Sequence, residues 1–479
     1  MSSAMSLPSV QPGTGPSWWL QEALAAEGQA AECPPLTDEA RVDVAIVGGG
    51  YTGLWTALML REREPGLSVA LVEADICGAG ASGKNGGIVH GYWTGLPQAV
   101  VACGDQGALE VARLGSVAQD GIRAFVEHCG RDLWWREGGI LKVATTPEQE
   151  QKLARHVETA RRLGVPDAAQ PLNAQEVRAR CNSPVFRAGV FFPEGATVQP
   201  ARLARALRQA ALNAGVRIFE RTPMVNVRAG KPCIVETPHG RLRADEVVLA
   251  TNAALTGWRG SRKHLTNFSS YMVLTEPVPE LLREIGWAGN EGISDGRMFV
   301  HYFRTTADGR VAMGSGSGPI GYDGRMDARR FNADAGTAAR AEAGLRRLLP
   351  ALANTRITHA WGGAIDVSSD HLPFFGTLPG TRIHYGCGYS GHGVNPTWIG
   401  GACLASLVLG ARDRWTASPF CARRVPGLPP EPFRYVGGCA IRSAILTCEA
   451  YEERGRRPPL LARIGAAVPA ALHLRIGTR

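Results

Sequence analysis

The sequence predicts an α/β protein in which a helix-covered parallel sheet is interleaved with a second, mixed or antiparallel sheet. Three observations predict this class. An apolar strand pattern beginning at Asp43 runs into a glycine-rich turn and then into an apolar helical pattern. A second strand pattern, residues 68–75, follows at the distance of one strand–helix–strand unit. Similar strand patterns return near residues 220, 250 and 385 with other material between them, which favours two intertwined domains over two sequential ones.

The chain is long enough for two or three domains, because it has 479 residues, of which 44% are hydrophobic and 20% charged. Its formal net charge is +9, and its arginines are spread along the whole sequence. We therefore expect no dedicated nucleic-acid surface. The basic balance favours an anionic cofactor or substrate, or weak attraction to an anionic membrane surface.

The eleven cysteines argue against a disulfide framework and against a metal site. Their number is odd, their spacing is scattered, and no CxxC pair occurs. We expect reduced thiols in a cytoplasmic protein. The first twenty residues lack the basic-then-apolar pattern of a signal peptide, and no apolar run reaches about 18 residues, so we also expect no transmembrane segment.

Local patterns predict the remaining elements. Residues 1–40 are rich in Pro, Ser and Gly and predict an N-terminal arm that Trp18, Trp19 and Leu20 dock onto the body. Asp308-Gly309 predicts a hairpin turn between two strands. The other expected elements are a helix at 147–164, strands at 216–230, 246–253, 271–276, 361–370 and 383–388, an apolar helix at 395–410 and a basic amphipathic helix at 440–457.

The first glycine turn has the spacing of a dinucleotide site. Gly48, Gly50 and Gly53 satisfy GxGxxG between a strand and a helix. Gly48 permits the tight turn, Gly50 lets a pyrophosphate touch the backbone, and Gly53 lets the helix pack close to the sheet. The helix N-terminus presents partial positive charge to the phosphates. Glu73 ends the next strand, where a carboxylate accepts hydrogen bonds from a ribose, so a Rossmann-like site is predicted.

Two further glycine-rich segments favour a flavin over a nicotinamide. "GAGASGKNGG", residues 78–87, follows the acidic strand and offers backbone N–H groups to a second part of a long ligand. "GCGYSGHGV", residues 386–394, is a second turn from a strand into a helix. A nicotinamide enzyme needs one such cradle, whereas a flavin enzyme also uses a helix N-terminus near the N1–C2=O edge, which becomes anionic on reduction.

These motifs, together with "VVLATNA" at residues 247–253, resemble in order and spacing the D-amino acid oxidase/sarcosine oxidase superfamily of FAD enzymes. Within it, the chain is most similar to the gamma-glutamylputrescine oxidoreductase branch, with its relatives proposed to act on aminophosphonates; the similarity covers about residues 17–435. The resemblance implies a Rossmann-like FAD-binding domain of the glutathione-reductase-like type interleaved with a mixed or antiparallel substrate domain. The implied segments are 41–100, 185–260 and 355–412 for the FAD domain, 101–184 and 261–354 for the substrate domain, and 413–479 for a partly helical C-terminal extension.

The resemblance also implies the residues that bind FAD. Lys84 stands where the branch usually has arginine, so the positive charge is kept but bidentate geometry is lost. No cysteine lies just before Asp370, where relatives with covalent flavin carry one, so we expect non-covalent FAD. The implied cofactor-binding residues are Gly48, Gly50, Tyr51, Thr52, Gly53, Glu73, Ala74, Ala81, Ser82, Lys84, Asn85, Gly86, Gly87, Val225, Thr251, Gly391, His392, Gly393 and Val394.

The implied reaction is oxidation of the C–N bond of an amine or amino acid. A hydride passes from the substrate to flavin N5, and water hydrolyses the resulting imine to an aldehyde or keto acid. The substrates left open are a polyamine derivative, an N-methyl or D-amino acid and an aminophosphonate, with oxygen or a quinone as electron acceptor. The alternative is a flavin dehydrogenase of a hydroxy acid or similar C–O substrate. The basic C-terminal helix can rest on a membrane surface or simply be solvated.

Substrate-binding candidates come from the expected central strands. Tyr302 and Arg304 share one strand face, so both can face the flavin, and Arg304 can hold a carboxylate or phosphonate. Tyr271 is a second lining candidate. Lys263 precedes its strand, in the region where oxidases of this superfamily use a lysine to help oxygen react. For each residue, ordinary packing or solvation is the alternative.

Three more positions bear on the substrate. His90 and Tyr92 follow the "SGKNGG" loop and share one face, so both are candidates for lining the pocket or for ordinary packing. Sarcosine oxidase relatives carry a carboxylate-binding lysine after the second glycine turn, where this chain has Asn395. A substrate acid group is therefore expected to be held by other residues.

Overall fold

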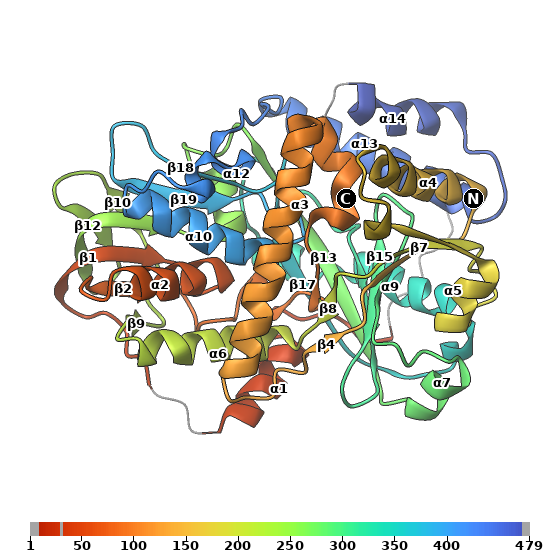
Figure 1. Cartoon of the computed structure of the whole chain (residues 1–479), viewed down its shortest axis with the longest axis horizontal. Coiled ribbons are helices and arrows are strands. Elements are labelled where there is room, and N and C mark those ends of the chain that lie inside the picture. The colour runs from red at the N-terminus through yellow and green to blue at the C-terminus, as the bar shows by residue number, and fades with distance from the viewer. Residues whose placement is uncertain (1–8, 29–31, 472–479) are drawn as a thin grey trace.

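The computed structural model describes residues 9–28 and 32–471, and Figure 1 shows the chain. The described strands form two eight-stranded sheets and one three-stranded sheet. The eight strands of the first sheet are β1 (Glu39–Val47), β2 (Val69–Val72), β9 (Arg217–Phe219), β10 (Asn226–Arg228), β11 (Cys233–Glu236), β12 (Arg241–Leu249), β18 (Phe374–Thr377) and β19 (Ile383–Cys387).

The first sheet has a parallel centre. Strands β2 and β12 flank β1, with β9 outside β2 and β19 outside β12, and all four pairings are parallel. Every residue of β2 is buried, as a strand covered on both faces requires. The carboxyl ends of β1 and β2 lead into the glycine turn and into Glu73, so the sheet itself brings these motifs to one edge.

Two apolar helices pack side by side beside this sheet. They are α2 (Tyr51–Arg63), which follows the first glycine turn, and α10 (Pro396–Val408), which follows the second. A Cβ at Gly401 would lie 2.6 Å from the Cβ of Trp55, so glycine permits this close approach. Because the helices touch, the two glycine turns at their N-termini lie near each other.

The second sheet is antiparallel except for one parallel pair, β5–β14, so the predicted mixed sheet is confirmed. Helix α9 (Ala335–Leu348) covers it, with Leu345 packed in one core cluster with Phe303. In order across the sheet, the strands are β17 (Ile357–Ser368), β13 (Leu265–Thr275), β16 (Val311–Ser315), β15 (His301–Thr305), β14 (Gly292–Asp295), β5 (Ile140–Ala144), β7 (Ala188–Phe192) and β6 (Gln170–Asn173).

Three strands of the segments expected to form the first domain, 185–260 and 355–412, lie outside the first sheet. Strands β7 and β17 pair within the second sheet, and β8 (Ala196–Thr197) pairs within the three-stranded sheet. Strand β17 pairs with β13 from Ile357 to Ser368, and Val367 near its end forms an isolated bridge with Tyr389, just after β19 of the first sheet. Apolar patterns predict that a strand exists, but they do not say which sheet completes its hydrogen bonds.

The Asp308-Gly309 hairpin is formed as predicted. The Gly309 φ of +77° supplies the left-handed turn between β15 and β16. The long helix α3 (Leu96–His128), kinked at Cys103–Gly104, runs between the two halves of the molecule in Figure 1. Smaller elements complete the body: β3 (Ile88–Val89), β4 (Arg136–Glu137), β8 (Ala196–Thr197), α4 (Pro147–Arg162), α5 (Ala174–Arg180), α6 (Pro200–Asn213), α7 (Pro279–Glu284), α8 (Ala328–Asn332), α11 (Arg414–Ala417) and α12 (Pro419–Ala422).

The described part of the expected N-terminal arm docks through helix α1 (Trp18–Glu27), whereas residues 1–8 and 29–31 of that arm lie outside the described residues. Trp19 is fully buried and Leu20 nearly so. The Ser17 hydroxyl caps the helix at the Leu20 N–H, 3.1 Å away, and also donates to the Gly83 carbonyl at 2.5 Å. The arm therefore supports the loop that carries the second glycine-rich segment.

The C-terminal extension contains helices α13 (Phe433–Glu452) and α14 (Leu460–Ala471), which pack on each other. Both basic side chains of α13, Arg434 and Arg442, point inward. Arg442 Nε donates to the Gly318 carbonyl at 2.9 Å, and Arg434 Nη1 donates to the Arg262 carbonyl at 2.7 Å. Within residues 9–28 and 32–471, no helix is both long and apolar enough to cross a membrane.

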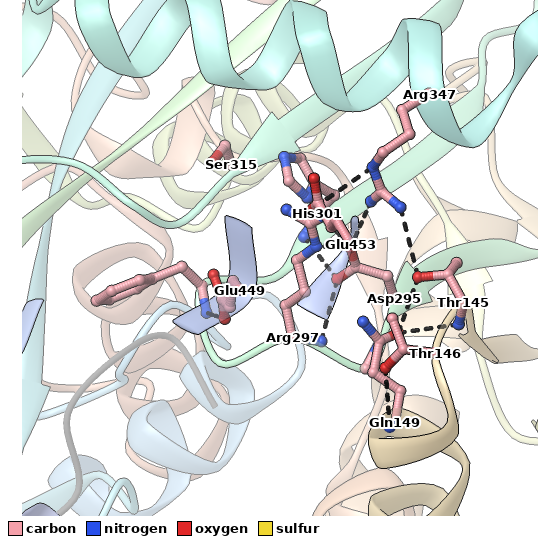
Figure 2. Close-up of polar contacts among 12 residues, drawn as sticks. Thr145, Thr146, Gln149, Asp295, Arg297, His301, Ser315, Arg347, Glu449 and Glu453 are labelled. Carbon is pink, nitrogen blue, oxygen red and sulfur yellow. Dashed lines mark hydrogen bonds and ion pairs between the residues drawn. The ribbon is translucent and has the colours of Figure 1, made fainter. Parts of the chain in front are cut away.

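A buried ionic cluster joins α13 to the turn between β14 and β15 (Figure 2). Asp295, which is fully buried, lies 3.1 Å from both the Arg297 Nε and the His301 Nδ1. Glu453 pairs with Arg297 and with Arg347. The Oε1 of Glu449 accepts the N–H groups of Met298 at 2.8 Å and Phe299 at 3.2 Å. The C-terminal extension therefore holds this turn directly.

We expect Glu449 to make stability depend on pH. Burial, opposed by Arg297 and reinforced by Asp295, raises the Glu449 pKa to about 7 from an ordinary 4.5. The folded protein thus binds this proton more tightly than the unfolded chain, so the stability that Glu449 contributes is fully present below pH 4.5 and is lost as pH rises through about 7. Glu449→Gln, which keeps the acceptor oxygen, should raise the free energy of unfolding above pH 7 by on the order of 3 kcal/mol and leave it unchanged at low pH.

Denaturant unfolding across pH measures this difference. Glu158→Gln on the exposed face of α4 is the matched control and should follow the wild-type profile. Parallel profiles for Glu449→Gln and wild type would show that Glu449 titrates normally.

Candidate functional site

A cavity of about 700 Å³ lies where the edges of the two large sheets meet. Its volume is in the range of pockets that bind small molecules and cofactors. Both glycine turns contribute to its wall, as do strands β14, β15 and β17 of the second sheet. Sixteen of the predicted cofactor-binding residues line it: Gly48, Gly50, Tyr51, Thr52, Glu73, Ala74, Ala81, Ser82, Lys84, Asn85, Gly86, Thr251, Gly391, His392, Gly393 and Val394.

The first glycine turn needs glycine at three positions for different reasons. Gly48 has φ +112°, and a Cβ there would lie 2.5 Å from the Ala250 carbonyl oxygen. A Cβ at Gly53 would overlap the Gly48 carbonyl, so Gly53 lets α2 pack onto the turn. A Cβ at Gly50 would lie 2.9 Å from the Ser82 hydroxyl, which also accepts the Tyr51 N–H. The turn therefore presents bare backbone at the N-terminus of α2.

Glu73 ends β2 at the cavity and is fixed by backbone donors. Its Oε2 accepts the Gly49 N–H at 2.6 Å, and its Oε1 accepts the Asp75 N–H at 3.0 Å. Burial raises its pKa despite these hydrogen bonds. Each carboxylate oxygen keeps a second lone pair, so the group can accept further hydrogen bonds from hydroxyls in the cavity.

The second glycine turn is held by Asp366 of β17. The Asp366 carboxylate accepts the N–H groups of Gly388 and Tyr389, and its backbone carbonyl accepts the Ser390 N–H at 2.8 Å. Burial, opposed by these hydrogen bonds, raises the Asp366 pKa to about 6. The turn leads into α10, whose N-terminal residues also line the cavity.

One hydroxyl pair links the two turns. Thr52 Oγ1 in the first turn of α2 lies 2.7 Å from the Tyr389 hydroxyl in the second glycine turn. Two helix N-termini therefore open into one cavity, where their partial positive charges can stabilise an anionic ligand at two points.

Comparison with known proteins identifies this arrangement. The family model described as FAD dependent oxidoreductase (DAO) matches residues 43–407. The gamma-glutamylputrescine oxidoreductase of Escherichia coli (strain K12) is 30% identical over 431 residues, covering 87% of this chain and 93% of the relative. The chain belongs to the DAO family of FAD-dependent oxidoreductases.

Two further comparisons agree. The glycine oxidase of Geobacillus kaustophilus (strain HTA426) is 28% identical over 401 residues, covering 80% of this chain and 97% of that protein. The crystal structure of glycine oxidase from Geobacillus kaustophilus superposes with a TM-score of 0.67 at 23% identity, covering 81% of this chain and all of that one. The structural superposition shows that this chain and the glycine oxidase share a fold.

The cavity fits the cofactor of this DAO-family enzyme. Bare backbone at Gly48 and Gly50 leaves room for a pyrophosphate, and the fixed Glu73 carboxylate suits a ribose. Asn85 shapes the intervening loop, because its Nδ2 donates to the Ser82 carbonyl at 2.9 Å and its Oδ1 accepts the Gly87 N–H at 2.8 Å.

Lys84 brings positive charge to the same wall. Its Nζ donates to Asn332 Oδ1 at 3.2 Å, and its carbonyl accepts the Trp361 indole N–H at 2.9 Å. Burial lowers the Lys84 pKa, opposed by the charge of Asp75. The ammonium is therefore anchored beside the cavity rather than extended into solvent.

Three predicted cofactor residues do not line the cavity. Gly53 lies behind the turn and Gly87 beneath the loop, where each permits a close backbone approach. Val225 is 67% exposed, and its N–H donates to the Glu236 carbonyl at 2.7 Å. Residues 222–224 line the cavity in its place, because the chain turns away into the β10–β11 hairpin at Val225.

Arg304 is not where a substrate anion can reach it. It shares a strand face with Tyr302, as parity predicts, but only Tyr302 lines the cavity. The Arg304 Nη1 donates to the carbonyls of Gly87 at 2.9 Å and Val198 at 2.6 Å, and the residue is 1% exposed. Arg304 thus supports the backbone below the glycine loop instead of lining the cavity.

Tyr271 and Lys263 also lie away from the cavity. The Tyr271 hydroxyl donates to the Arg330 carbonyl at 3.0 Å and accepts the Asp334 N–H at 2.7 Å, so it faces the helices behind β13. Lys263 is exposed on the surface, and its carbonyl accepts the Leu428 N–H. Strand periodicity predicts two faces but does not say which one meets the cavity.

His90, Tyr92 and Asn395 do line the cavity. The rings of His90 and His392 contact edge to face with centroids 5.3 Å apart. The Asn395 Nδ2 donates to the Gly115 carbonyl at 2.9 Å and to Gln119 Oε1 at 3.1 Å. Asn395 therefore fastens α10 to α3.

The sequence-based prediction missed Lys142, Ser270 and Ser294, which line the cavity from strands of the second sheet. Lys142 had a visible signal, because it interrupts the apolar strand "GGILKVA" with a charge. A lysine inside a buried strand needs a polar group or solvent that its ammonium can contact. The two serines carry no comparable signal, since serine is common in exposed strands.

We expect Gly53→Ala to abolish FAD retention. The added methyl group overlaps the Gly48 carbonyl, so α2 must move away from the turn, at a cost of about 1–3 kcal/mol or more in stability. The measurements are the FAD content of the purified protein and its thermal unfolding.

Gly66→Ala is the matched control. Gly66 lies on the exposed loop after the same helix, and a Cβ there meets nothing within 4 Å. Full FAD content in Gly53→Ala would contradict the close packing of helix and turn.

Proposed function

We propose that this enzyme oxidises the C–N bond of an amine or amino acid, giving an imine that water hydrolyses to an aldehyde or keto acid. The observation that carries the proposal is the relationship to a gamma-glutamylputrescine oxidoreductase at 30% identity over most of both chains. The glycine oxidase relative supports the same bond type. Bound FAD would supply the two-electron acceptor for this oxidation.

In this proposal, FAD binds non-covalently and lies along the wall from Glu73 to the second glycine turn. The N-terminus of α2 would hold the pyrophosphate, and the N-terminus of α10, with Gly391–Val394, would hold the flavin pyrimidine edge. Glu73 accepts hydrogen bonds from the ribose. The hydrogen bond between the hydroxyls of Thr52 and Tyr389 holds the two helix N-termini next to each other.

The chain's own residues must position a neutral amine and exclude water. Tyr302 lines the cavity, and burial raises its pKa to about 12, so its hydroxyl stays protonated. His90 and His392 also line it.

The electron acceptor in the proposed cycle is oxygen or a quinone. The exposed apolar side chains Phe433, Leu460 and Leu461 on the C-terminal helices offer a peripheral membrane contact for the quinone route. Admission of air to the reduced enzyme distinguishes the two, because direct reoxidation requires no quinone.

We expect the purified protein to be yellow and its flavin to be bleached anaerobically by at least one amine. The panel is glycine, sarcosine, gamma-glutamylputrescine and aminomethylphosphonate, with lactate, glycolate and glycerol 3-phosphate as matched C–O substrates. Absorbance of the bound flavin is the measurement. Bleaching by the hydroxy compounds alone would assign the enzyme to C–O oxidation, and bleaching by neither set would contradict the proposal.

A further inference from the structure

Helix α14 carries its large apolar side chains on the outside of the molecule. Leu461 is 84% exposed, Leu460 is 66% exposed and Ile464 is 55% exposed. Figure 1 shows this helix at the edge of the molecule, next to α13. Single exposed apolar residues are common on protein surfaces, but three large ones close together on one short helix form a patch. We call Leu460, Leu461 and Ile464 the apolar face.

The inward side of α14 is built from small residues instead. Ala462 is buried, and a Cβ at Gly465 would lie 2.8 Å from the Ala444 Cβ on α13. Ala466 packs against the apolar cluster that contains Ile445. Burial of a leucine or isoleucine stabilises a fold far more than burial of an alanine or glycine. Because the large side chains point outward, the apolar face contributes little to holding α14 on the body.

Four exposed arginines border the apolar face. Arg454, Arg456 and Arg457 lie in the connection between α13 and α14, and Arg463 lies on α14 itself. The connection forms a compact turn, because the N–H groups of Arg454 and Arg456 both donate to the Tyr451 carbonyl at 3.0 Å. The arginines are therefore presented beside the start of α14.

The acidic residues at the end of α13 are turned toward the body. Glu449 is buried and accepts N–H groups of the turn between β14 and β15. Glu453 pairs with Arg297 and Arg347 in the ionic cluster of Figure 2. The charges of this stretch therefore separate, with these carboxylates facing the body and the guanidinium groups facing solvent.

Helix α4 borders the same region with charges of both signs. Burial raises the pKa of Glu452 at the end of α13, and from α4 the charge of Lys152 lowers this pKa while that of Glu148 raises it. Burial also raises the pKa of Cys448, and the charges of Arg463 and Lys152 oppose that rise. The excess of positive charge around the apolar face thus comes from the four arginines.

We propose that the apolar face and the four arginines dock the enzyme on the surface of an anionic lipid bilayer. The apolar side chains enter the boundary between head groups and acyl chains, and the guanidinium groups bind the lipid phosphates beside them. A guanidinium suits this role because it pairs with two phosphate oxygens through parallel N–H donors. Helix α14 is 12 residues long, so it lies in the plane of the interface and does not cross the bilayer.

Charge favours a bilayer over a second copy of this chain as the occupant. In a symmetric dimer the same surface of both copies meets, so the arginines around the two apolar faces would repel each other. The formal net charge of +9 adds to that repulsion, whereas an anionic surface attracts it. The contact deepens the quinone route of the proposed function, on which its catalytic meaning rests, because a lipid-soluble acceptor is held in the bilayer.

Sedimentation of the FAD-loaded enzyme with vesicles tests the contact. One set of vesicles is pure phosphatidylcholine, and the other contains about one third phosphatidylglycerol, an anionic lipid. We expect binding to the anionic vesicles that weakens as salt is raised, and little binding to the neutral ones. The double variant Arg456→Gln/Arg457→Gln should lower the partition coefficient about 10- to 30-fold through lost attraction to the surface. Leu461→Gln/Ile464→Gln should lower it about 10-fold through lost insertion.

Matched substitutions on α3 are the controls. Val101→Gln removes an exposed apolar residue and Arg113→Gln removes an exposed arginine, and both variants should bind vesicles as wild type does. Because every substituted side chain is exposed, FAD content and thermal unfolding should match wild type throughout.

Several results would overturn the proposal. They are equal binding to neutral and anionic vesicles, binding to neither, and wild-type binding by either double variant. Light scattering that shows a dimer for wild type and a monomer for Leu461→Gln/Ile464→Gln would also overturn it, because the apolar face would then join two copies of the chain.

The vesicle measurement needs no substrate, so it is separate from the test of amine oxidation. If the enzyme binds anionic vesicles and no amine bleaches its flavin, the membrane contact stands and amine oxidation fails. If amines bleach the flavin and the enzyme binds no vesicles, the oxidation stands and the membrane contact is wrong.

Discussion

The position of the cavity depends on two helices, α2 and α10, which both begin at the cavity and pack against each other. Helices α2 and α10 come from opposite ends of the family-matched region, yet they pack side by side through Gly401 and Trp55. Their glycine turns are joined by the hydroxyls of Thr52 and Tyr389. Asp366 adds a link from the second sheet, because it holds the second turn by three backbone N–H groups. Asp366 therefore ties strand β17 of the second sheet to the turn that precedes α10.

The glycine turns could be predicted from sequence because their geometry is local. Glycine spacing, the preceding strand and Glu73 lie within one strand–helix–strand unit, and sixteen of the expected residues do line the cavity. The roles expected for Arg304 and Tyr271 failed because they depend on partners far away in sequence. Arg304 finds carbonyls 106 and 217 residues away, and Tyr271 contacts residues 59 and 63 positions later. Lys142 was detectable as a charge in an apolar strand, but its neighbour Ser294 depends on strand register, which composition does not show.

Charge is distributed unevenly around the cavity. The wall nearest the glycine turns uses backbone N–H groups and helix N-termini, which stabilise anions without paying the full desolvation cost of a buried side-chain charge. The wall formed by the second sheet instead uses the side-chain ammonium of Lys142, oriented by Thr94 and Phe192. The first wall is thus built mainly from backbone groups, whereas the second presents side chains to the cavity.

Glu449 also bears on the order in which the enzyme is assembled. It accepts the N–H of Phe299, a residue made 150 positions earlier, and so fixes the turn between the two strands that carry Ser294 and Tyr302. During synthesis from the N-terminus, the first sheet and both glycine turns leave the ribosome before this contact can form. The first sheet and its two glycine turns can therefore fold during synthesis before α13 is available to fix the turn between β14 and β15.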